Sequence, residues 1–457
     1  MLQTLKNAWK TKEIRNKILF TLLILLLYRI GTVIPVPFVN GNAFSNQFGG
    51  TILEYMNTLS GGALQSTTLF ALGVSPYINA SIIIQLLAVV FPRLGEIAKT
   101  DKAKMNLITR IVTVILAIVT AIGYYFLIMR SNALVKSATP GEGDYAWIYA
   151  VVIVACYCAG ASIIMWLGER INEKGIGNGI SLILFANIIS SIPSFMYELG
   201  RLIVSTFSDS SNAALYGTLA VVFAVVLLAV LIALIIFVIW ITGSERRISV
   251  RYAKQIRGRK MYGGQNQNLP IKVNMTGVMP IIFASSIVSL VPTILTFAGV
   301  STSNGWYKFF AAEGVFYPVC LFVLIIAFTY FYTQITFDPI EVANRIKSQG
   351  GTIAGIRQGK PTSDFIKNVL GKVTLVGALF LGIIAVIPVV GGPHVISHIL
   401  TWFNNGINVG TSQINVSQLT ATFTFGGTTL LILVGVVLET FRELEAQLTM
   451  RNYKGFL

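Results

Sequence analysis

The chain has 457 residues, of which 54% are hydrophobic and only 11% are charged, and its mean hydropathy is +0.73. A soluble domain carries about 25% charged residues, so this composition excludes an ordinary soluble domain and indicates a membrane protein. The formal net charge is +16. Such a basic chain could bind nucleic acid, but the basic residues lie between apolar runs, which disfavours DNA. Ribosomal RNA or an acidic protein partner stays open.

Ten apolar runs are candidates for membrane-spanning helices, which need about 20 residues each. We expect them at approximately 18–37, 76–91, 107–129, 146–167, 180–197, 216–241, 275–297, 316–337, 373–390 and 424–438. The second run is short, begins at Pro76 and carries Asn79, Ser81 and Gln85. Proline suits the first turn of a helix, and polar residues in a span favour a cavity over lipid. The second run is therefore predicted to be a broken helix that lines a cavity.

Ten spans place both termini on the same side of the membrane. If that side is the cytoplasm, its segments hold 29 of the 34 Lys and Arg residues, and the external segments hold four. Arg29 lies within the first span, where its long side chain can reach the interface, and we interpret it as structural. This partition follows the positive-inside rule, and it predicts an all-α polytopic protein with both termini in the cytoplasm.

The ten spans divide into an N-terminal half, 18–205, and a C-terminal half, 206–438. A five-span unit repeated in tandem enters the membrane in opposite orientations, which predicts inverted halves that meet in a polar external loop at 195–216. Residues 1–17 are predicted to form an amphipathic cytoplasmic helix, with a disordered tail as the alternative. A signal peptide is disfavoured because no small-residue cleavage site follows. Residues 439–457 are expected to be a cytoplasmic tail.

The sequence shows no motif for catalysis, a cofactor or a metal. Its two histidines, His394 and His398, share one predicted external loop, and Cys156, Cys158 and Cys320 all lie in apolar runs. We therefore expect no enzyme activity. The predicted span interiors also lack acidic residues, which disfavours the alternative of an ion-coupled transporter, although a sodium site made of carbonyls stays open. A membrane scaffold without a pore is disfavoured by the polar second span.

Two predicted cytoplasmic loops, 243–274 and 338–372, are long and basic, with eight and six Lys or Arg residues. These numbers exceed what membrane orientation requires. We expect the loops to dock a partner that supplies energy.

A series of short motifs, in order along nearly the whole chain, resembles the SecY family, the channel subunits of the bacterial Sec protein translocase. The motifs are YRIG at 28–31, IPVP at 34–37, SGGAL at 60–64, FALG at 70–73, PYINASIIIQ at 76–85, WLGE at 166–169, GIGNGIS at 175–181, AK at 253–254, LPIKVN at 269–274, FASS at 283–286, GIR at 355–357 and FGGT at 425–428. The resemblance is weakest in the external loops, especially 391–422, and the sequence does not indicate what that loop does.

The resemblance implies ten helices in two inverted halves, arranged as a clamshell around an hourglass pore. It implies a channel that passes unfolded secretory polypeptides across the bacterial plasma membrane and releases apolar helices sideways into lipid. The implied drivers are the SecA ATPase or the ribosome. The implied partners are the SecE and SecG subunits, signal sequences, secretory precursors and membrane lipids.

The resemblance also implies four groups of site residues. The pore ring is Val74, Ile78, Leu184, Ile282 and Ile432, which without the resemblance would be ordinary packing residues. The plug spans 53–66 and includes Tyr55, Met56, Asn57, Leu59, Ser60, Gly61, Gly62, Ala63 and Leu64. The lateral gate carries Asn79, Gln85, Asn274, Ser285 and Ser286. The surface for SecA or the ribosome comprises Arg246, Arg247, Arg251, Lys254, Arg257, Arg259, Lys260, Arg357 and Lys360. Gln358 stands where the family usually has proline, which predicts a looser loop around Arg357.

Overall fold

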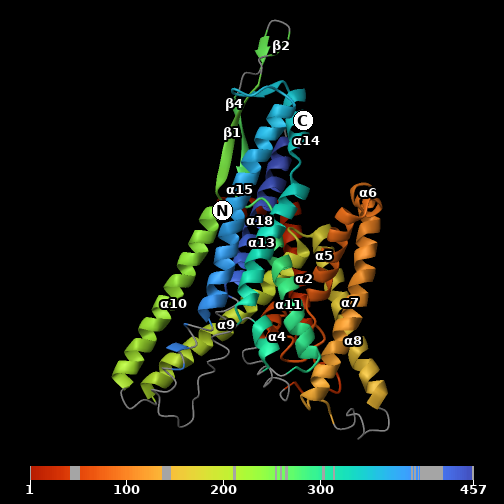
Figure 1. Cartoon of the computed structure of the whole chain (residues 1–457), viewed down its shortest axis with the longest axis vertical. Helices are drawn as coiled ribbons and strands as arrows, with labels where there is room; N and C mark the ends of the chain where they lie inside the picture. Colours follow the sequence, from red (N-terminus) through yellow and green to blue (C-terminus); the bar gives the residue numbers. More distant parts are fainter. Residues whose placement is uncertain are drawn as a thin grey trace.

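Ten long helices dominate the fold and correspond to the ten apolar runs of the sequence (Figure 1). The computed structural model describes residues 2–41, 52–135, 146–208, 213–252, 255–257, 260–262, 266–300, 304–311, 314–392, 395, 398–399, 401 and 426–454. Within these residues the long helices are α2 (Lys12–Gly31), α5 (Ser75–Val90), α7 (Lys102–Arg130), α8 (Ala146–Lys174), α9 (Gly179–Ser208), α10 (Ala213–Thr242), α11 (Met279–Phe297), α13 (Phe316–Thr336), α15 (Lys360–Gly391) and α18 (Gly426–Lys454).

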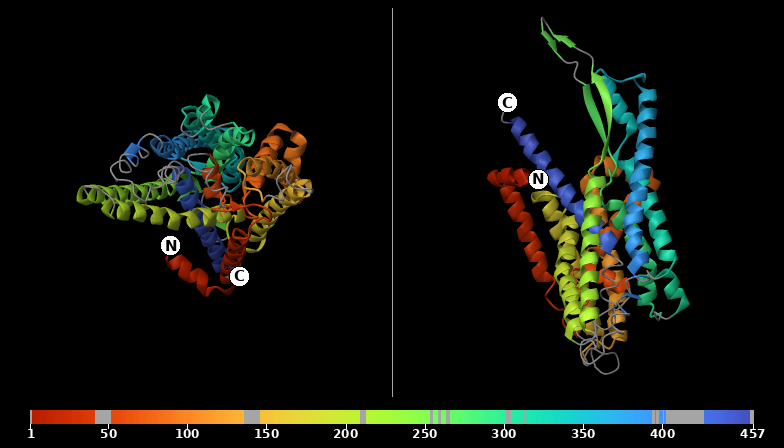
Figure 2. Two further views of the ribbon diagram at one scale, coloured as in Figure 1. Left: turned by 90° about the horizontal axis from the view of Figure 1, so that it is seen from below. Right: turned by 90° about the vertical axis from the view of Figure 1, so that its left-hand side faces the viewer.

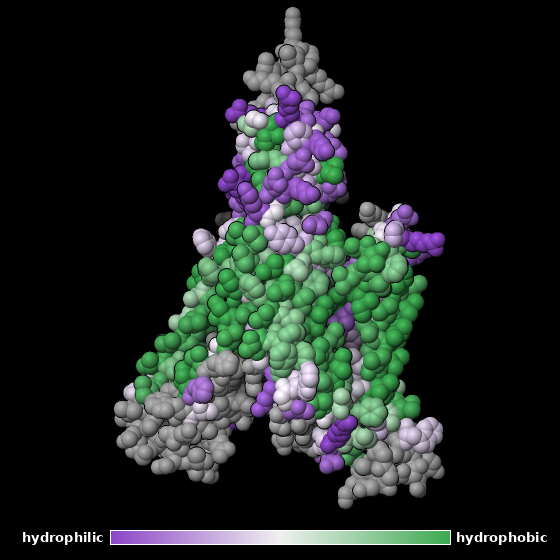
Figure 3. Space-filling view, in the orientation of Figure 1, coloured by the Kyte–Doolittle hydropathy of each residue, from purple (hydrophilic) through white to green (hydrophobic). Residues whose placement is uncertain are grey.

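The helices stand side by side and are apolar over their middle parts (Figures 2 and 3). Seven of them are long and apolar enough to cross a membrane, and a bent pair, α5 with α6 (Pro92–Thr100), raises the number to eight among the described residues. On the face drawn in Figure 3, apolar side chains cover the middle of the bundle and hydrophilic side chains gather at one end. This distribution is that of a multi-pass membrane protein.

The second span is short and broken, as predicted. α5 has 16 residues with a proline in its first turn, and the chain bends by 117° where α6 begins at Pro92. Proline cannot donate a backbone hydrogen bond, so it favours the start of a new helix over the continuation of the old one.

Two predicted boundaries differ from the structure. The amphipathic helix α1 (Leu2–Lys10) ends before residue 17, because the chain breaks at Thr11 and α2 begins at Lys12. The predicted external loop at 195–216 is wrong in extent, since α9 runs to Ser208 and α10 begins at Ala213. Apolar packing extends both helices there, through the buried cluster Leu199, Leu202, Ala220 and Leu227. At the other terminus, α18 continues to Lys454, so the described part of the tail is helical.

The prediction of an all-α fold misses a small antiparallel sheet in the two long loops. Strands β1 (Glu245–Tyr252), β4 (Asn266–Lys272) and β5 (Gly351–Ile353) form it in the order β4-β1-β5. A second pair, β2 (Gln255–Arg257) with β3 (Lys260–Tyr262), forms a hairpin beyond it. Because β1 and β4 come from one loop and β5 from the other, the sheet joins both loops into one unit.

The sheet has its own apolar core, at the end of the molecule beyond the helix bundle (Figure 1). The buried side chains of β1, Ile248 and Val250, alternate with exposed ones, the pattern of a strand with one buried face. They pack with Ile346 of α14 (Pro339–Ser348) and Ile366 of α15. The α15 helix therefore runs from this unit into the bundle.

Both chain termini lie toward this same end of the molecule (Figures 1 and 2). α1 packs beside α18, where the Thr4 hydroxyl donates to Glu445 Oε1 at 3.4 Å. The Lys17 ammonium donates to Gln447 Oε1 at 3.1 Å. The described termini and both basic loops thus share one side of the bundle, in agreement with an even number of spans.

Candidate functional site

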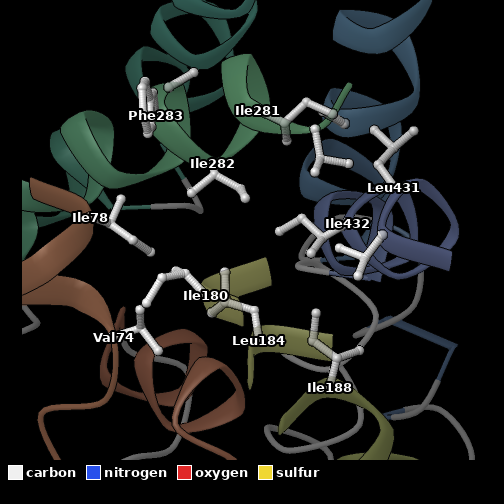
Figure 4. Close-up of a cluster of buried hydrophobic side chains, with 14 of the residues drawn as sticks. Val74, Ile78, Ile180, Leu184, Ile188, Ile281, Ile282, Phe283, Leu431 and Ile432 are labelled. Carbon is white, nitrogen blue, oxygen red and sulfur yellow. The ribbon is translucent and has the colours of Figure 1, made fainter. Parts of the chain in front are cut away.

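The five aliphatic residues predicted to form a pore ring come together in one buried cluster (Figure 4). They are Val74 at the start of α5, Ile78 in α5, Leu184 in α9, Ile282 in α11 and Ile432 in α18. Their exposed fractions lie between 1% and 5%. Four helices that are distant in the sequence therefore supply one buried apolar cluster. If this cluster is the predicted constriction, it would resist the passage of ions, because water leaves a narrow apolar space.

Close helix contacts hold this constriction in place. A Cβ at Gly435 of α18 would lie 2.2 Å from the side chain of Val278, the residue that precedes α11. A Cβ at Gly179 would lie 2.0 Å from the backbone oxygen of Gly168, where α9 crosses α8. Glycine at these positions lets the helices approach closely enough for their aliphatic side chains to meet.

The predicted plug is a short helix, α4 (Ile52–Leu59), followed by a compact turn. The Ser60 hydroxyl donates to the Asn57 carbonyl at 3.0 Å and accepts from the Leu64 backbone N–H at 3.2 Å. Gly61 and Gly62 follow with φ of +69° and +87°, a region that glycine enters without strain. Hydrogen bonds within the segment therefore hold the turn after α4 in its compact form.

The plug segment packs on two apolar clusters. Leu53 and Leu64 are buried beside Tyr124 of α7 and Tyr157 of α8, and Leu59 packs against the constriction cluster. Ala63 is also buried. Met56 accepts a hydrogen bond from Thr293 of α11 at 3.6 Å. Tyr55 lies in α4, but its side chain is outside the described part of the chain.

Two polar residues contact the plug segment. The Arg29 guanidinium donates to the Gly61 carbonyl at 3.4 Å, so the interpretation of Arg29 as an interfacial side chain is incomplete. The buried Asn187 of α9 donates to the Leu59 carbonyl at 2.7 Å and to the Tyr28 hydroxyl at 2.9 Å. Asn187 is not among the predicted site residues, although an asparagine inside an apolar span was an available signal.

The predicted gate residues lie on or near α5 and α11, which pack against each other. Gln85 donates to Ser81 at 2.9 Å and accepts a hydrogen bond from the hydroxyl of Tyr332 in α13. Ser285 donates back to the Ile282 carbonyl of its own helix. A polar link from α5 to α13 is therefore made through Tyr332, which is not among the predicted site residues.

The remaining gate residues differ in burial. Asn274 is buried, and its side-chain oxygen has no hydrogen-bonding partner among the described residues. Asn79 and Ser286 are half-buried, on α5 and α11.

The sheet arranges the predicted docking residues. Arg246 and Arg251 of β1 are exposed, and Arg247 pairs with Glu245 at 2.7 Å. Arg357 and Lys360 are also exposed. Arg257 and Lys260 lie in the hairpin with side chains outside the described part, and Lys254 and Arg259 lie wholly outside it.

The pairing of β1 with β5 brings the second basic loop beside the first, with Arg251 opposite Thr352. The loop that carries Arg357 is closed by hydrogen bonds. The Gln358 amide donates to the Gly351 carbonyl at 3.0 Å, and the Thr362 hydroxyl donates to the Arg357 carbonyl at 2.7 Å. The Gln358 side chain therefore makes a hydrogen bond across the base of the loop, and the loosening relative to proline stays a prediction.

Two cations and a carboxylate lie at the base of the sheet. Burial lowers the pKa of Lys272 in β4, the nearby Arg442 of α18 lowers that pKa further, and Glu245, opposite Lys272 in β1, raises it. The Arg442 guanidinium donates to the Thr242 carbonyl at the end of α10, at 2.9 Å. A cation at that position also interacts favourably with the helix dipole.

These features define a multi-pass helical membrane protein with a buried aliphatic cluster between its helices and a basic unit at one end. The SecY family model matches residues 68–441. The "Protein translocase subunit SecY" of Bacillus licheniformis is 38% identical, and that of Mycobacterium tuberculosis is 39% identical, each over the full length of both chains. The chain belongs to the SecY family.

The fold matches solved structures at lower sequence identity. A structure described as a protein conducting channel is 19% identical, with a TM-score of 0.59. The match covers 94% of this chain and 92% of the chain in that structure. Sec61 in the canine ribosome-channel complex is 17% identical with a TM-score of 0.54, at the same coverage. The likeness to these structures supports the ten-helix polytopic fold.

Proposed function

We propose that this chain is the pore-forming subunit of a protein translocase, through which unfolded secretory polypeptides cross the membrane. The constriction of Val74, Ile78, Leu184, Ile282 and Ile432 supports this function most directly. Aliphatic side chains can change rotamers around a passing chain of any sequence, while an apolar ring resists ions. Membership of a family of translocase subunits supports the same proposal.

Residues 53–66 act as a plug in this proposal, and α5 with α11 form a lateral gate between two inverted halves. The plug lies against the constriction through Leu59. Separation of α5 from α11 opens the bundle sideways, so an apolar segment can leave for lipid. Interhelical hydrogen bonds in membranes are worth only about 1 kcal/mol, so a gate with few of them can close and reopen.

The basic unit built on the β4-β1-β5 sheet docks the partner that drives transport, either the SecA ATPase or the ribosome. Exposed Arg246, Arg251, Arg357 and Lys360 support this role by their charge. A solved relative is described as a channel bound to a ribosome. The chain works with SecE and SecG in the bacterial plasma membrane, and its termini and basic loops face the cytoplasm, as the distribution of Lys and Arg favours.

Site-specific crosslinking tests the channel. A single cysteine replaces Ile282, in a chain whose Cys156, Cys158 and Cys320 are substituted, and a secretory precursor is stalled midway with SecA and ATP. A crosslink that requires ATP and a signal sequence supports the proposal. The matched control places the cysteine at Ile153, which is equally buried but belongs to another cluster. No crosslink at 282 in a folded complex, or an equal crosslink at 153, contradicts a polypeptide path through the constriction.

A further inference from the structure

Asn187 joins three separate segments of the molecule from a fully buried position. Its side-chain amide nitrogen donates to the Tyr28 hydroxyl of α2 at 2.9 Å and to the Leu59 carbonyl at the end of α4 at 2.7 Å. An asparagine amide has two hydrogens, so a single group holds α2 and α4 to α9. Buried polar groups are costly unless they are paired. The Asn187 side-chain oxygen has no hydrogen-bonding partner among the described residues, so the two bonds of the amide nitrogen are what the side chain gains in this position.

The turn after Leu59 fits closely against the same polar groups. The Arg29 guanidinium donates to the Gly61 carbonyl at 3.4 Å. A Cβ at Gly61 would lie 2.8 Å from Arg29 Nη1 and 2.8 Å from Asn187 Oδ1. With φ of +69°, Gly61 also has a backbone conformation that other residues rarely adopt. Only glycine lets the backbone of the turn approach Arg29 and Asn187 this closely.

The same face of α9 carries the constriction and this contact. Leu184 lies three residues before Asn187, and residues at this spacing are neighbours on a helix surface. Leu184 belongs to the constriction cluster, against which Leu59 also packs. A shift of α9 relative to α2 would therefore disturb the constriction and the hydrogen bonds of Asn187 together.

We propose that Asn187 is a positioning residue that, with Arg29, latches the turn 59–61 in its seat until α9 and α2 separate. The proposal rests on the proposed function of residues 53–66 as a plug. The latch is weak, because it consists of one hydrogen bond from the Asn187 amide to the Leu59 carbonyl and one long hydrogen bond from Arg29 to the Gly61 carbonyl. It therefore holds the segment at rest and releases it when the helices move.

Cysteine accessibility tests the latch without any transported substrate. Ala63 is buried at 1% exposure, so a cysteine there reacts with a maleimide only when the segment leaves its seat. The full chain, lacking its three native cysteines, is labelled in membrane vesicles. Loss of a buried hydrogen bond in Asn187→Leu should raise the labelling rate by about 5- to 30-fold. Arg29→Met should raise it less, because the bond of Arg29 is longer.

Two variants separate a latch from general loosening. Tyr28→Phe removes the bond between α2 and α9 but keeps the bond to Leu59, so its labelling rate should rise less than that of Asn187→Leu. Ser181→Ala removes a buried hydroxyl of α9 that has no hydrogen-bonding partner in the described part of the chain, and its labelling rate should equal that of the parent chain. All variants are compared at equal amounts of folded protein. Their melting temperatures show whether a variant loosens the whole fold.

An unchanged labelling rate in both Asn187→Leu and Arg29→Met overturns the latch, and so does an equal rise in Ser181→Ala. A fluorescent ion-leak assay on the same vesicles then tests the plug itself. Faster labelling with more leak supports both the latch and the plug. Faster labelling without more leak keeps the latch and contradicts the sealing role of residues 53–66 in the proposed function.

Discussion

The hydrogen bond from Tyr332 to Gln85 is a direct polar link between the two proposed halves, and its removal tests the lateral gate. Tyr332→Phe deletes only the hydroxyl that donates to Gln85. The aromatic contacts of the ring, to Phe283 at 5.1 Å and to Phe331 at 5.5 Å, are kept. The variant should therefore weaken the closed gate without removing its packing.

The size of the effect follows from the environment of the bond. A hydrogen bond between membrane helices contributes about 0.6–2 kcal/mol, which corresponds to a change of about 3- to 30-fold in the ratio of open to closed gate. The assay is the membrane insertion of test segments with graded hydrophobicity. In Tyr332→Phe, segments of lower hydrophobicity should exit into lipid, because opening the gate requires less free energy.

The chain offers a matched control on the same helix. Tyr330 also donates one hydrogen bond, to the Gly371 carbonyl of α15 at 3.2 Å, and both helices belong to the C-terminal half. Tyr330→Phe should lower thermal stability by a similar amount and leave the insertion threshold unchanged. Equal thresholds in the two variants, or a higher threshold in Tyr332→Phe, would refute a gate between α5 and the C-terminal half.

Three further predictions concern packing and docking. Gly160→Ala should destabilise the fold by about 1–3 kcal/mol or more, since its Cβ would lie 1.9 Å from the Leu69 backbone oxygen. The control Gly200→Ala has open space around its Cβ, so its melting temperature should stay close to that of the parent chain. Arg357→Glu should reduce SecA-driven export by at least about tenfold, because a glutamate would repel the acidic groups of the docked partner. The melting temperature should not change, since Arg357 is exposed. Normal export would contradict the docking role. Val250→Asp should expose residues 243–274 to limited proteolysis, because a buried charge opposite Ile353 separates β1 from β5. If these residues resist the protease as well as in the parent chain, the sheet does not join the two loops into one unit.

The positions of the helices were predictable because hydropathy and charge are properties of contiguous residues. The ten apolar runs, the short proline-started second span and the shared side of the described termini all follow from composition within one segment. The extents of α9 and α10 were not predictable, because Leu202 of α9 and Ala220 of α10 stabilise each other although serine residues between them predict a loop. The strand β1 was missed although Ile248 and Val250 alternate with polar residues, because its basic side chains indicated only a docking loop.

The site divides in the same way. Without the family resemblance, the sequence identified Val74 and Ile432 only as packing residues, and the structure places them in one buried cluster. The bonds of Asn187 join residues 159 and 128 positions apart, and the bond of Tyr332 spans 247 positions. A sequence by itself determines which residues are apolar, charged or turn-forming, because these preferences act locally. Only the tertiary structure decides which distant polar groups become partners, because partnership depends on how the helices pack.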